Sequence, residues 1–419
     1  MSDHPTEDPS PIWYPYTQML TAPAPVCLER AEGIYLYPSD GRKILDGISS
    51  WWVNIHGHSH PRLNQAIDAQ AKKLSQVMLA GFTHAPAQQL ATALVDRAPS
   101  SLKWVFFSDD GSTAVEVALK MVYQYWRNRG QPQRNLFVAF EHAYHGDTLG
   151  AMAVGNIQEF HSEFSDLLFE VRHAAESHES LKTILNQEKD RVAAVLVEPM
   201  VQGAGGMKIY PAQFLRDVRA LTQEAGIPLV ADEVFTGFGR TGKMFACEHG
   251  PVEPDLMCLS KGLTGGYLPL AATLVSDEIY QAFLSKDRAR TFFHGHSFTG
   301  NALSCAVALE SLAVFDEEEH LERVAELELL FTGRLQDFHK LAIVRETRGI
   351  GALAVLELEP RTQSGYLDAL GPRLTQTFLE EGLLLRPLGN VLYFLPPYVI
   401  TNEEVHWVFD TIKKVLSRQ

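Results

Sequence analysis

The chain has 419 residues, of which 46 % are hydrophobic and 21 % are charged, a composition that is ordinary for a globular protein. This length is sufficient for two or three subdomains that share a large core. The formal net charge of −15 argues against a nucleic-acid binder, which needs a basic face, and against docking on an anionic membrane surface.

The N-terminal sequence MSDHPTEDPSP is polar and acidic, so it resembles neither a signal peptide nor a transit peptide. The longest apolar stretches, such as 192–197 and 268–275, are far too short to span a bilayer. No CxxC spacing occurs among the cysteines, which are Cys27, Cys247, Cys258 and Cys305. These features predict free, mostly buried thiols in a reducing cytoplasm.

The first clear elements are a buried strand over 104–107 and a helix that starts at Thr113. The helix carries one apolar face, made by Val115, Leu119, Val122 and Trp126. Thr113 and Glu116 form a T-x-x-E pattern, which predicts a capping box at its start.

Further apolar runs follow at 136–140, 192–197, 227–231, 256–259 and 270–275. A helix opened by Pro211 lies between the second and the third of them, with an apolar stripe at Phe214, Val218, Leu221 and Ala225. Continuous Val/Ile/Leu runs that alternate with helices predict an α/β fold with a mostly parallel central sheet covered on both faces. Ligands of such sheets bind beyond the carboxyl ends of the strands.

The stretch 156–191 has weaker signals and is predicted to be a loop insertion with one helix over 180–186. Beyond Glu317 the pattern changes to short strands at 343–346 and 353–358 and a helix near 374–380. We therefore expect three parts: an N-terminal segment 1–55 that joins the small domain and the active site, a large cofactor-binding domain 56–316, and a smaller α+β domain 317–419.

Three short sequences with chemistry-bearing residues each end a predicted strand: E198-P, D232-E-V and S260-K261-G262. A buried lysine in a Gly-flanked loop suits a Schiff base, because burial lowers its pKa and favours the neutral amine. A carboxylate facing the same cleft would keep the ring nitrogen of pyridoxal phosphate (PLP) protonated. The alternatives are an aspartate in a salt bridge and a solvated lysine in a turn.

Two further segments follow strands. D109-D-G-S-T113 offers a tight turn and the N–H groups of a helix start, which suit a phosphate, although such a turn needs no ligand. It lacks the lysine of a P-loop and the third glycine of a dinucleotide fingerprint. In H142-A-Y-H-G146, Tyr144 is placed to cover a planar cofactor or simply to pack.

Six segments together resemble the class III PLP aminotransferases, in that family's order and spacing, between Tyr14 and Tyr398: D-D-G-S-T, A-Y-H-G-D-T, E-P-M-V-Q-G-A-G-G, A-D-E-V-F-T-G-F-G-R-T-G, L-S-K-G-L-T-G-G and H-G-H-S-F-T-G-N. The resemblance implies PLP-dependent transferase fold type I and a homodimer with its active sites at the subunit interface. It also implies that Gly111 and Ser112 bind the phosphate, that Tyr144 covers the ring, that Asp232 holds the pyridine nitrogen and that Lys261 is the catalytic lysine. Ser297, with Gly295 and His296, would reach the phosphate from the partner subunit.

Three more segments resemble the branch of the family that aminates 8-amino-7-oxononanoate to 7,8-diaminononanoate in biotin synthesis: W13-Y-P-Y-T-Q-M19, S49-S-W-W-V-N-I-H-G-H58 and R386-P-L-G-N-V-L-Y-F-L-P-P-Y398. That substrate has a long alkyl chain and a remote carboxylate. The resemblance implies an apolar wall of Tyr16, Trp51 and Trp52, with Trp51 facing the substrate, and a carboxylate clamp at Arg386. Arg240 and Tyr393 are further expected contacts.

The amino donor stays open at this point. Members that use S-adenosylmethionine tend to have H-G-P-T-F, whereas this chain has H294-G-H-S-F298, which resembles members that use lysine. Tyr16 and the two tryptophans favour S-adenosylmethionine. The alternatives are a general ω-aminotransferase acting on diamines or ω-amino acids, a 2,1-aminomutase, and a PLP-holding regulatory module without turnover.

His56, His58 and His60 alternate in a way that would place them on one face of a strand, as in some metal sites. No acidic residue or cysteine accompanies them locally. We therefore expect no metal site there.

Overall fold

The computed structural model describes residues 11–360 and 366–418. Its largest sheet is built from β4 (Leu102–Ser108), β5 (Leu136–Phe140), β6 (Val171–Ala174), β7 (Val192–Val197), β10 (Leu229–Asp232), β11 (Leu256–Leu259) and β12 (Ala271–Ser276). The strands lie in the order β4-β12-β11-β10-β7-β5-β6. All neighbours from β11 to β6 are parallel, whereas β12 runs antiparallel to both β11 and β4. The predicted mostly parallel sheet is confirmed, with β12 as its reversed strand.

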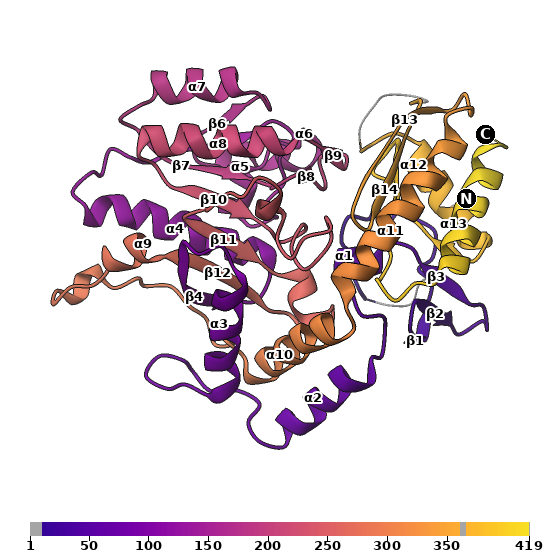
Figure 1. The fold of residues 1–419 in the computed structure, drawn as a ribbon, viewed down its shortest axis with the longest axis horizontal. Coiled ribbons are helices and arrows are strands. Elements are labelled where there is room, and N and C mark those ends of the chain that lie inside the picture. Colours follow the sequence, from indigo (N-terminus) through magenta and orange to yellow (C-terminus); the bar gives the residue numbers. More distant parts are fainter. Residues whose placement is uncertain (1–10, 361–365, 419) are drawn as a thin grey trace.

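Helices cover this sheet, namely α2 (Pro61–Ala71), α3 (Ala85–Arg97), α4 (Gly111–Asn128), α7 (His178–Gln187), α8 (Ala212–Ala225) and α10 (Ala302–Glu317). Figure 1 shows α7 and α8 together near β6, with α3, α10 and α2 at the opposite end of the sheet. The central strands β7, β10 and β11 are buried along their whole length. This explains why the sequence shows continuous apolar runs there instead of an alternating pattern.

Helix α4 begins one turn earlier than its apolar pattern. Asp110 is the N-cap, because its carboxylate accepts the Thr113 N–H at 2.9 Å while the Thr113 hydroxyl accepts the Asp110 N–H at 3.1 Å. The capping box predicted for Thr113 and Glu116 is therefore wrong. The Glu116 carboxylate instead accepts the N–H of Gly150 at 2.6 Å, at the start of α5 (Leu149–Val154).

The N-terminal and C-terminal parts of the chain share a second set of sheets. The strands β1 (Leu28–Glu32), β2 (Tyr35–Pro38) and β3 (Ile44–Asp46) form one sheet with β15 (Leu383–Leu384), which is parallel to β3. A three-stranded antiparallel sheet contains β13 (Val344–Ile350), β14 (Leu353–Leu358) and β16 (Val391–Phe394). Figure 1 shows both sheets at the right of the molecule, beside α11 (His320–Leu335), α12 (Leu370–Glu380) and α13 (Asn402–Leu416). The division at residues 55 and 316 stays a prediction.

The remaining short elements are α1 (Ser49–Trp52), α6 (Gln158–His161), β8 (Val201–Gln202), β9 (Lys208–Ile209), α9 (Asp277–Gln281) and five 3₁₀ turns at 162–167, 246–249, 261–264, 288–290 and 336–338. The helix predicted over 180–186 is confirmed as α7, whereas the sequence pattern missed β6 in the same stretch. Among the described residues, no helix combines the length and the apolar character needed to cross a membrane.

The segment α1 is unusual because it is a left-handed turn. Ser49, Ser50, Trp51 and Trp52 have φ values of 51°, 46°, 70° and 73°. Each such residue costs roughly 1–2 kcal/mol relative to the right-handed conformation. The conformation therefore depends on contacts from the rest of the fold, and local sequence patterns do not predict it.

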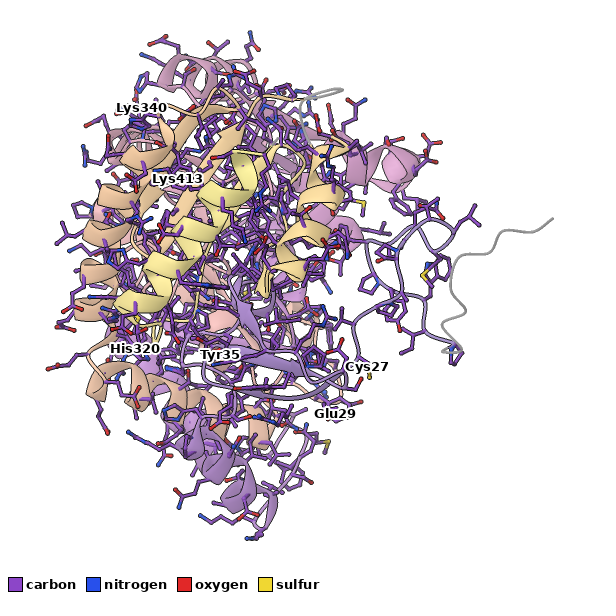
Figure 2. All side chains as sticks on the ribbon, turned by 90° about the vertical axis from the view of Figure 1, so that its right-hand side faces the viewer. Cys27, Glu29, Tyr35, His320, Lys340 and Lys413 are labelled. Atoms are coloured by element: carbon purple, nitrogen blue, oxygen red, sulfur yellow. The ribbon has the colours of Figure 1, made fainter. Side chains whose placement is uncertain are left out.

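The cysteines are all free, as predicted: Cys247, Cys258 and Cys305 are buried. Cys27 is exposed beside the N-terminal strands, as Figure 2 shows.

Candidate active site

A cavity of about 710 Å³ opens at the carboxyl ends of the parallel strands. Its wall includes Glu198 after β7, Asp232 at the end of β10 and Lys261 after β11. The start of α4 contributes Gly111 and Ser112, and the loop after β5 contributes residues 144–148. The sequence segments predicted to carry chemistry are thus brought together in one place.

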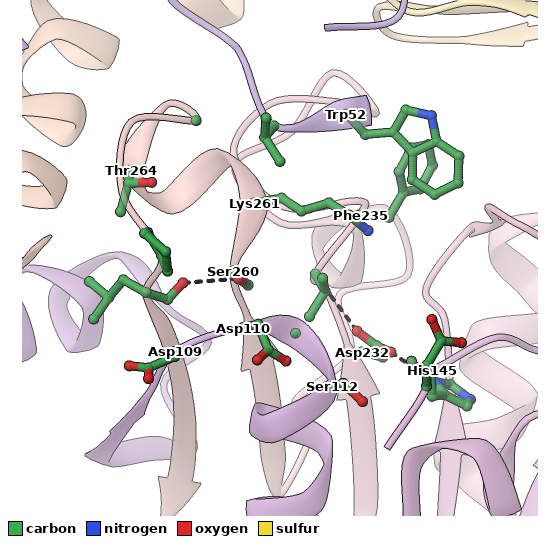
Figure 3. A pocket seen from close by; sticks show the side chains of 18 of the residues that line it. Trp52, Asp109, Asp110, Ser112, His145, Asp232, Phe235, Ser260, Lys261 and Thr264 are labelled. Carbon is green, nitrogen blue, oxygen red and sulfur yellow. Dashed lines mark hydrogen bonds and ion pairs between the residues drawn. The ribbon is translucent and has the colours of Figure 1, made fainter. Parts of the chain in front are cut away.

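Lys261 extends into this cavity toward two aromatic rings, as Figure 3 shows. Its Nζ lies 4.8 Å from the ring centre of Trp52 and 5.9 Å from that of Phe235. Burial lowers the pKa of the amine to about 8, although the charges of Asp232 and Glu198 oppose this shift. A buried amine with a lowered pKa can act as a nucleophile near neutral pH.

Asp232 is buried and held in one orientation. Its Oδ1 accepts the N–H of Val234 at 3.1 Å, and its Oδ2 lies 2.7 Å from Nδ1 of His145, the contact dashed in Figure 3. Burial alone would lower the pKa of His145, but the hydrogen bond and charge of Asp232 and the charge of Glu198 raise it. His145 thus fixes the orientation of the Asp232 carboxylate, an acceptor that suits a protonated ring nitrogen.

Glu198 is a second buried carboxylate at the edge of this pair. It accepts the N–H groups of Tyr144 at 3.0 Å and of Gly203 at 2.9 Å, so it fixes the loop that carries Tyr144. Burial raises its pKa to about 7, with His145 opposing and Asp232 reinforcing the shift. Glu198 therefore orients the tyrosine and does not titrate as an ordinary exposed carboxyl group.

The N-terminus of α4 forms a polar recess. The Ser112 hydroxyl lies 2.7 Å from that of Thr148 and accepts the Thr148 N–H at 3.0 Å. A Cβ on Gly146 would collide with the Ser112 side chain, and one on Gly111 would lie 2.5 Å from Cγ1 of Val234. The glycines therefore allow backbone and hydroxyl groups to converge, as binding of a phosphate at a helix N-terminus requires.

The expected substrate residues form a second group next to the cavity. Trp52 lines the cavity and donates from Nε1 to the Tyr393 hydroxyl at 3.0 Å. Trp51 is partly exposed; its ring lies 5.5 Å from that of Tyr16 and 4.7 Å from the guanidinium carbon of Arg386. Tyr16 lies 3.2 Å from the Tyr144 hydroxyl and donates to Asp147 at 2.5 Å. Burial raises the pKa of both tyrosines, so both stay neutral donors.

Arg240 lies outside the lining of this cavity. Its guanidinium is fully buried and donates to the carbonyls of Pro396 at 3.0 Å, Trp52 at 3.3 Å and Asn54 at 3.0 Å. In this arrangement Arg240 links the chain around Trp52 to the segment that follows β16. A direct contact with substrate stays a prediction.

Gly295, His296 and Ser297 lie in an exposed loop of the same chain. Nδ1 of His296 is 3.4 Å from Oδ2 of Asp109, and the carbonyl of Ser297 accepts from Gln76 at 2.6 Å. The predicted contact of this loop with a phosphate in a partner subunit stays a prediction.

The three histidines point to different partners in an irregular segment before α2. His56 contacts His320 and Ser311, each at 2.8 Å, while His58 contacts Asp46 at 3.0 Å and His60 contacts Glu318 at 3.0 Å. The strand face considered from their alternation is not formed.

The sequence patterns did not single out three residues that complete the site, namely His145, Asp147 and Thr148. All three belong to the segment A-Y-H-G-D-T, in which only Tyr144 was assigned a role. The signal was their position one to four residues from Tyr144, in a loop that follows a buried strand.

Comparisons with known proteins agree on one family. The family profile described as Aminotransferase class-III matches residues 16–416. The adenosylmethionine-8-amino-7-oxononanoate aminotransferase of Synechococcus elongatus is 45 % identical, over 97 % of this chain and 98 % of that protein. The enzyme of the same name from Aquifex aeolicus is 42 % identical, over 96 % and 94 %.

Two solved structures extend the comparison to the fold. That of the adenosylmethionine-8-amino-7-oxononanoate aminotransferase of Methanocaldococcus jannaschii has a TM-score of 0.94 at 39 % identity and covers 97 % of both chains. A PLP-bound amine transaminase from an uncultivated Pseudomonas species has a TM-score of 0.92 at 29 % identity, over 98 % and 99 %.

Proposed function

Because the chain belongs to the class III aminotransferases, we propose that it is a PLP-dependent enzyme that aminates 8-amino-7-oxononanoate to 7,8-diaminononanoate with S-adenosylmethionine as amino donor. The relatives that share this name are aligned over nearly the whole chain. The predicted family, fold type and enzyme class are thereby confirmed.

The described residues fit the cofactor. Ser112 and the N-terminus of α4 suit its phosphate, Asp232 suits its ring nitrogen, Tyr144 would cover the ring and Lys261 would hold the cofactor through its amine. PLP, when bound, supplies an electron-accepting ring that delocalises the negative charge left on a deprotonated substrate carbon.

The chain's own groups perform the proton transfers. With its pKa lowered to about 8, Lys261 is neutral often enough at neutral pH to accept a proton from a substrate carbon and return it elsewhere. Asp232, with His145 behind it, keeps a proton on the ring nitrogen. Trp52 and Phe235 shield the amine from water on one side.

The observation that carries the choice of substrate is a row of side chains beside the catalytic lysine. Lys261 contacts the ring of Trp52, Trp51 immediately precedes Trp52 in the chain, and Arg386 lies over Trp51. An apolar wall with an amine at one end and a guanidinium at the other suits an alkyl chain that carries a ketone and a remote carboxylate.

Turnover with defined acceptors tests the proposal. Purified protein with PLP is given S-adenosylmethionine and 8-amino-7-oxononanoate, pyruvate or 2-oxoglutarate, and the amine products are measured by mass spectrometry. We expect 7,8-diaminononanoate, with a kcat/KM at least a hundredfold above that for either small oxo acid. A higher kcat/KM with pyruvate would instead support a general ω-aminotransferase.

The donor is tested in separate arms. S-adenosylmethionine or lysine is added alone to the PLP form, and loss of the cofactor's visible absorbance is followed. We expect S-adenosylmethionine to discharge the absorbance at a lower concentration than lysine. The reverse order would assign lysine as donor, in agreement with His296 and Ser297 in the exposed loop.

We further propose a cytoplasmic homodimer in which each subunit completes its partner's site. Two large apolar side chains at the 294–298 loop support this proposal. Phe293 is 75 % exposed and Phe298 is 58 % exposed in the single chain, and exposed apolar side chains of this size are typical of protein interfaces. The free thiols are consistent with a reducing compartment.

A further inference from the structure

Trp51 and Trp52 reach the active site from four consecutive left-handed residues, Ser49 to Trp52, none of which is glycine. L-residues adopt such a run only when the surrounding structure holds it in place. The groups that hold this turn therefore determine where the two indoles lie.

Asp46, at the end of β3, holds the turn from inside. Its side chain is completely buried, and its Oδ1 accepts the N–H groups of Ile48 at 3.2 Å and Ser50 at 3.0 Å. Its Oδ2 accepts the Ser50 hydroxyl at 2.7 Å and Nε2 of His58 at 3.0 Å. Each carboxylate oxygen thus accepts two hydrogen bonds. Three of the four donors belong to Ile48 and Ser50, and the fourth is His58.

Other groups hold the outer side of the turn. The Ser49 hydroxyl donates to the carbonyl of Leu395 at 2.7 Å, and Arg240 donates to the carbonyl of Trp52. These contacts attach the turn to neighbouring segments. Asp46 differs because it bonds Ser50, in the centre of the turn, through both backbone and side chain.

We propose that Asp46, oriented by His58, is a positioning residue that keeps Trp51 and Trp52 between Arg386 and Lys261 for the acceptor substrate. The identity of that substrate rests on the proposed function. Asp46 itself lies outside the cavity lining and acts through the turn.

A carboxylate suits this positioning role because both of its oxygens accept hydrogen bonds. Asparagine has nearly the same volume but presents an N–H₂ group in place of one oxygen. With its amide on the Oδ1 side it would face the N–H groups of Ile48 and Ser50, which cannot accept. On the Oδ2 side it would face the Ser50 hydroxyl and Nε2 of His58, which would both have to change from donor to acceptor. Asp46→Asn therefore loosens the turn while largely preserving the packing around it.

Steady-state kinetics test the proposal. For Asp46→Asn we expect the KM for 8-amino-7-oxononanoate to rise about tenfold, with kcat within threefold of wild type. Asp40→Asn is the matched control, since Asp40 is an exposed carboxylate in the β2–β3 turn that pairs with Arg42. An unchanged KM, or a loss confined to kcat, would refute the positioning role.

A second substitution, at Ser50, separates backbone strain in the turn from a general loss of folding or activity. Glycine adopts the left-handed conformation without a steric penalty, so Ser50→Gly in the Asp46→Asn background is expected to bring KM back to within threefold of wild type. Ser50→Ala removes the same hydroxyl but keeps the penalty, so it should not rescue. Equal behaviour of the two double variants would overturn the proposal.

A readout without turnover keeps this test independent of the proposed function. Hydrogen exchange of a peptide covering residues 47–54 should be about tenfold faster in Asp46→Asn than in wild type or Asp40→Asn. Equal exchange contradicts the inference even if the enzyme uses another acceptor, whereas failure to aminate 8-amino-7-oxononanoate contradicts only the proposed function.

If Asp46→Asn does not fold, His58→Gln is tested instead. We then expect a threefold rise in KM and faster exchange of the 47–54 peptide. No change in either quantity would refute the positioning role of Asp46.

Discussion

The amine of Lys261 is surrounded by two aromatic rings and the charges of Asp232 and Glu198, and the balance lowers its pKa to about 8 from an ordinary 10.5. At pH 7 roughly a tenth of the amine is then neutral, compared with about 0.03 % for an ordinary lysine. We expect the rate at which the apoenzyme captures PLP to rise about tenfold between pH 6 and 7 and to level off above pH 8. Stopped-flow absorbance measures this rate, and a flat profile from pH 6 to 9 would contradict the lowered pKa.

Removal of the Lys261 amine gives a second prediction for a single residue. Lys261→Ala should lose the visible absorbance of the bound cofactor and at least a thousandfold in kcat, because no other group replaces the lost nucleophile and base. Absorbance spectra and turnover test this. Lys286→Ala, at an exposed lysine, should match wild type in both; an unchanged spectrum in Lys261→Ala would exclude the assignment.

At the level of elements, α4 connects fold stability with the proposed phosphate site. Its N-cap Asp110 satisfies the Thr113 N–H directly beside Ser112. Asp110→Ala should lower the free energy of unfolding by about 1 kcal/mol, whereas Asp110→Asn retains a good cap and should cost much less. Urea unfolding of both variants measures the difference. Equal destabilisation would mean that charge, and not capping, is the property that matters.

The elements also show what the sequence could predict. Strands β7 and β11 match their predicted ranges because their apolar runs are continuous. Strand β6 was missed because Arg172 and His173 interrupt its apolar pattern at the edge of the sheet. The left-handed turn α1 was out of reach, since contacts from distant segments such as Leu395 hold it. The predicted cap Thr113 was wrong because a T-x-x-E pattern also occurs within the first turn of α4, after the observed cap Asp110.

Within the candidate active site, too, residues marked by local sequence patterns differ from those that depend on distant contacts. Ser112, Asp232 and Lys261 each lie at or just beyond the end of a strand, so a local pattern could predict that they lie near one another. The role of His145, by contrast, becomes clear from its contact with Asp232, 87 residues further along the chain. Arg240 was expected at the substrate because of its position in a motif, yet its donors are directed to three backbone carbonyls.

At the scale of the whole molecule, the proposed dimer makes the exposed loop part of a functional site. Phe293→Asp should weaken self-association and reduce activity together, because it places a charge in the apolar face beside the 294–298 loop. Sedimentation velocity and turnover at matched concentrations test this. Leu329→Asp is the control, at a side chain on α11 that is similarly exposed. A monomeric Phe293→Asp with full activity would rule out the shared site.

The sheet that joins β3 to β15 has a consequence for how the protein is made. The Leu45 N–H bonds to the carbonyl of Gly382, and the Leu395 N–H bonds to that of Gly47, so partners are separated by more than 330 residues. During translation, residues 44–55 emerge early but must wait for nearly the whole chain before these bonds can form. The turn that carries Trp51 and Trp52 is therefore among the last regions to assemble, and a truncated chain that stopped before Leu383 would lack these bonds.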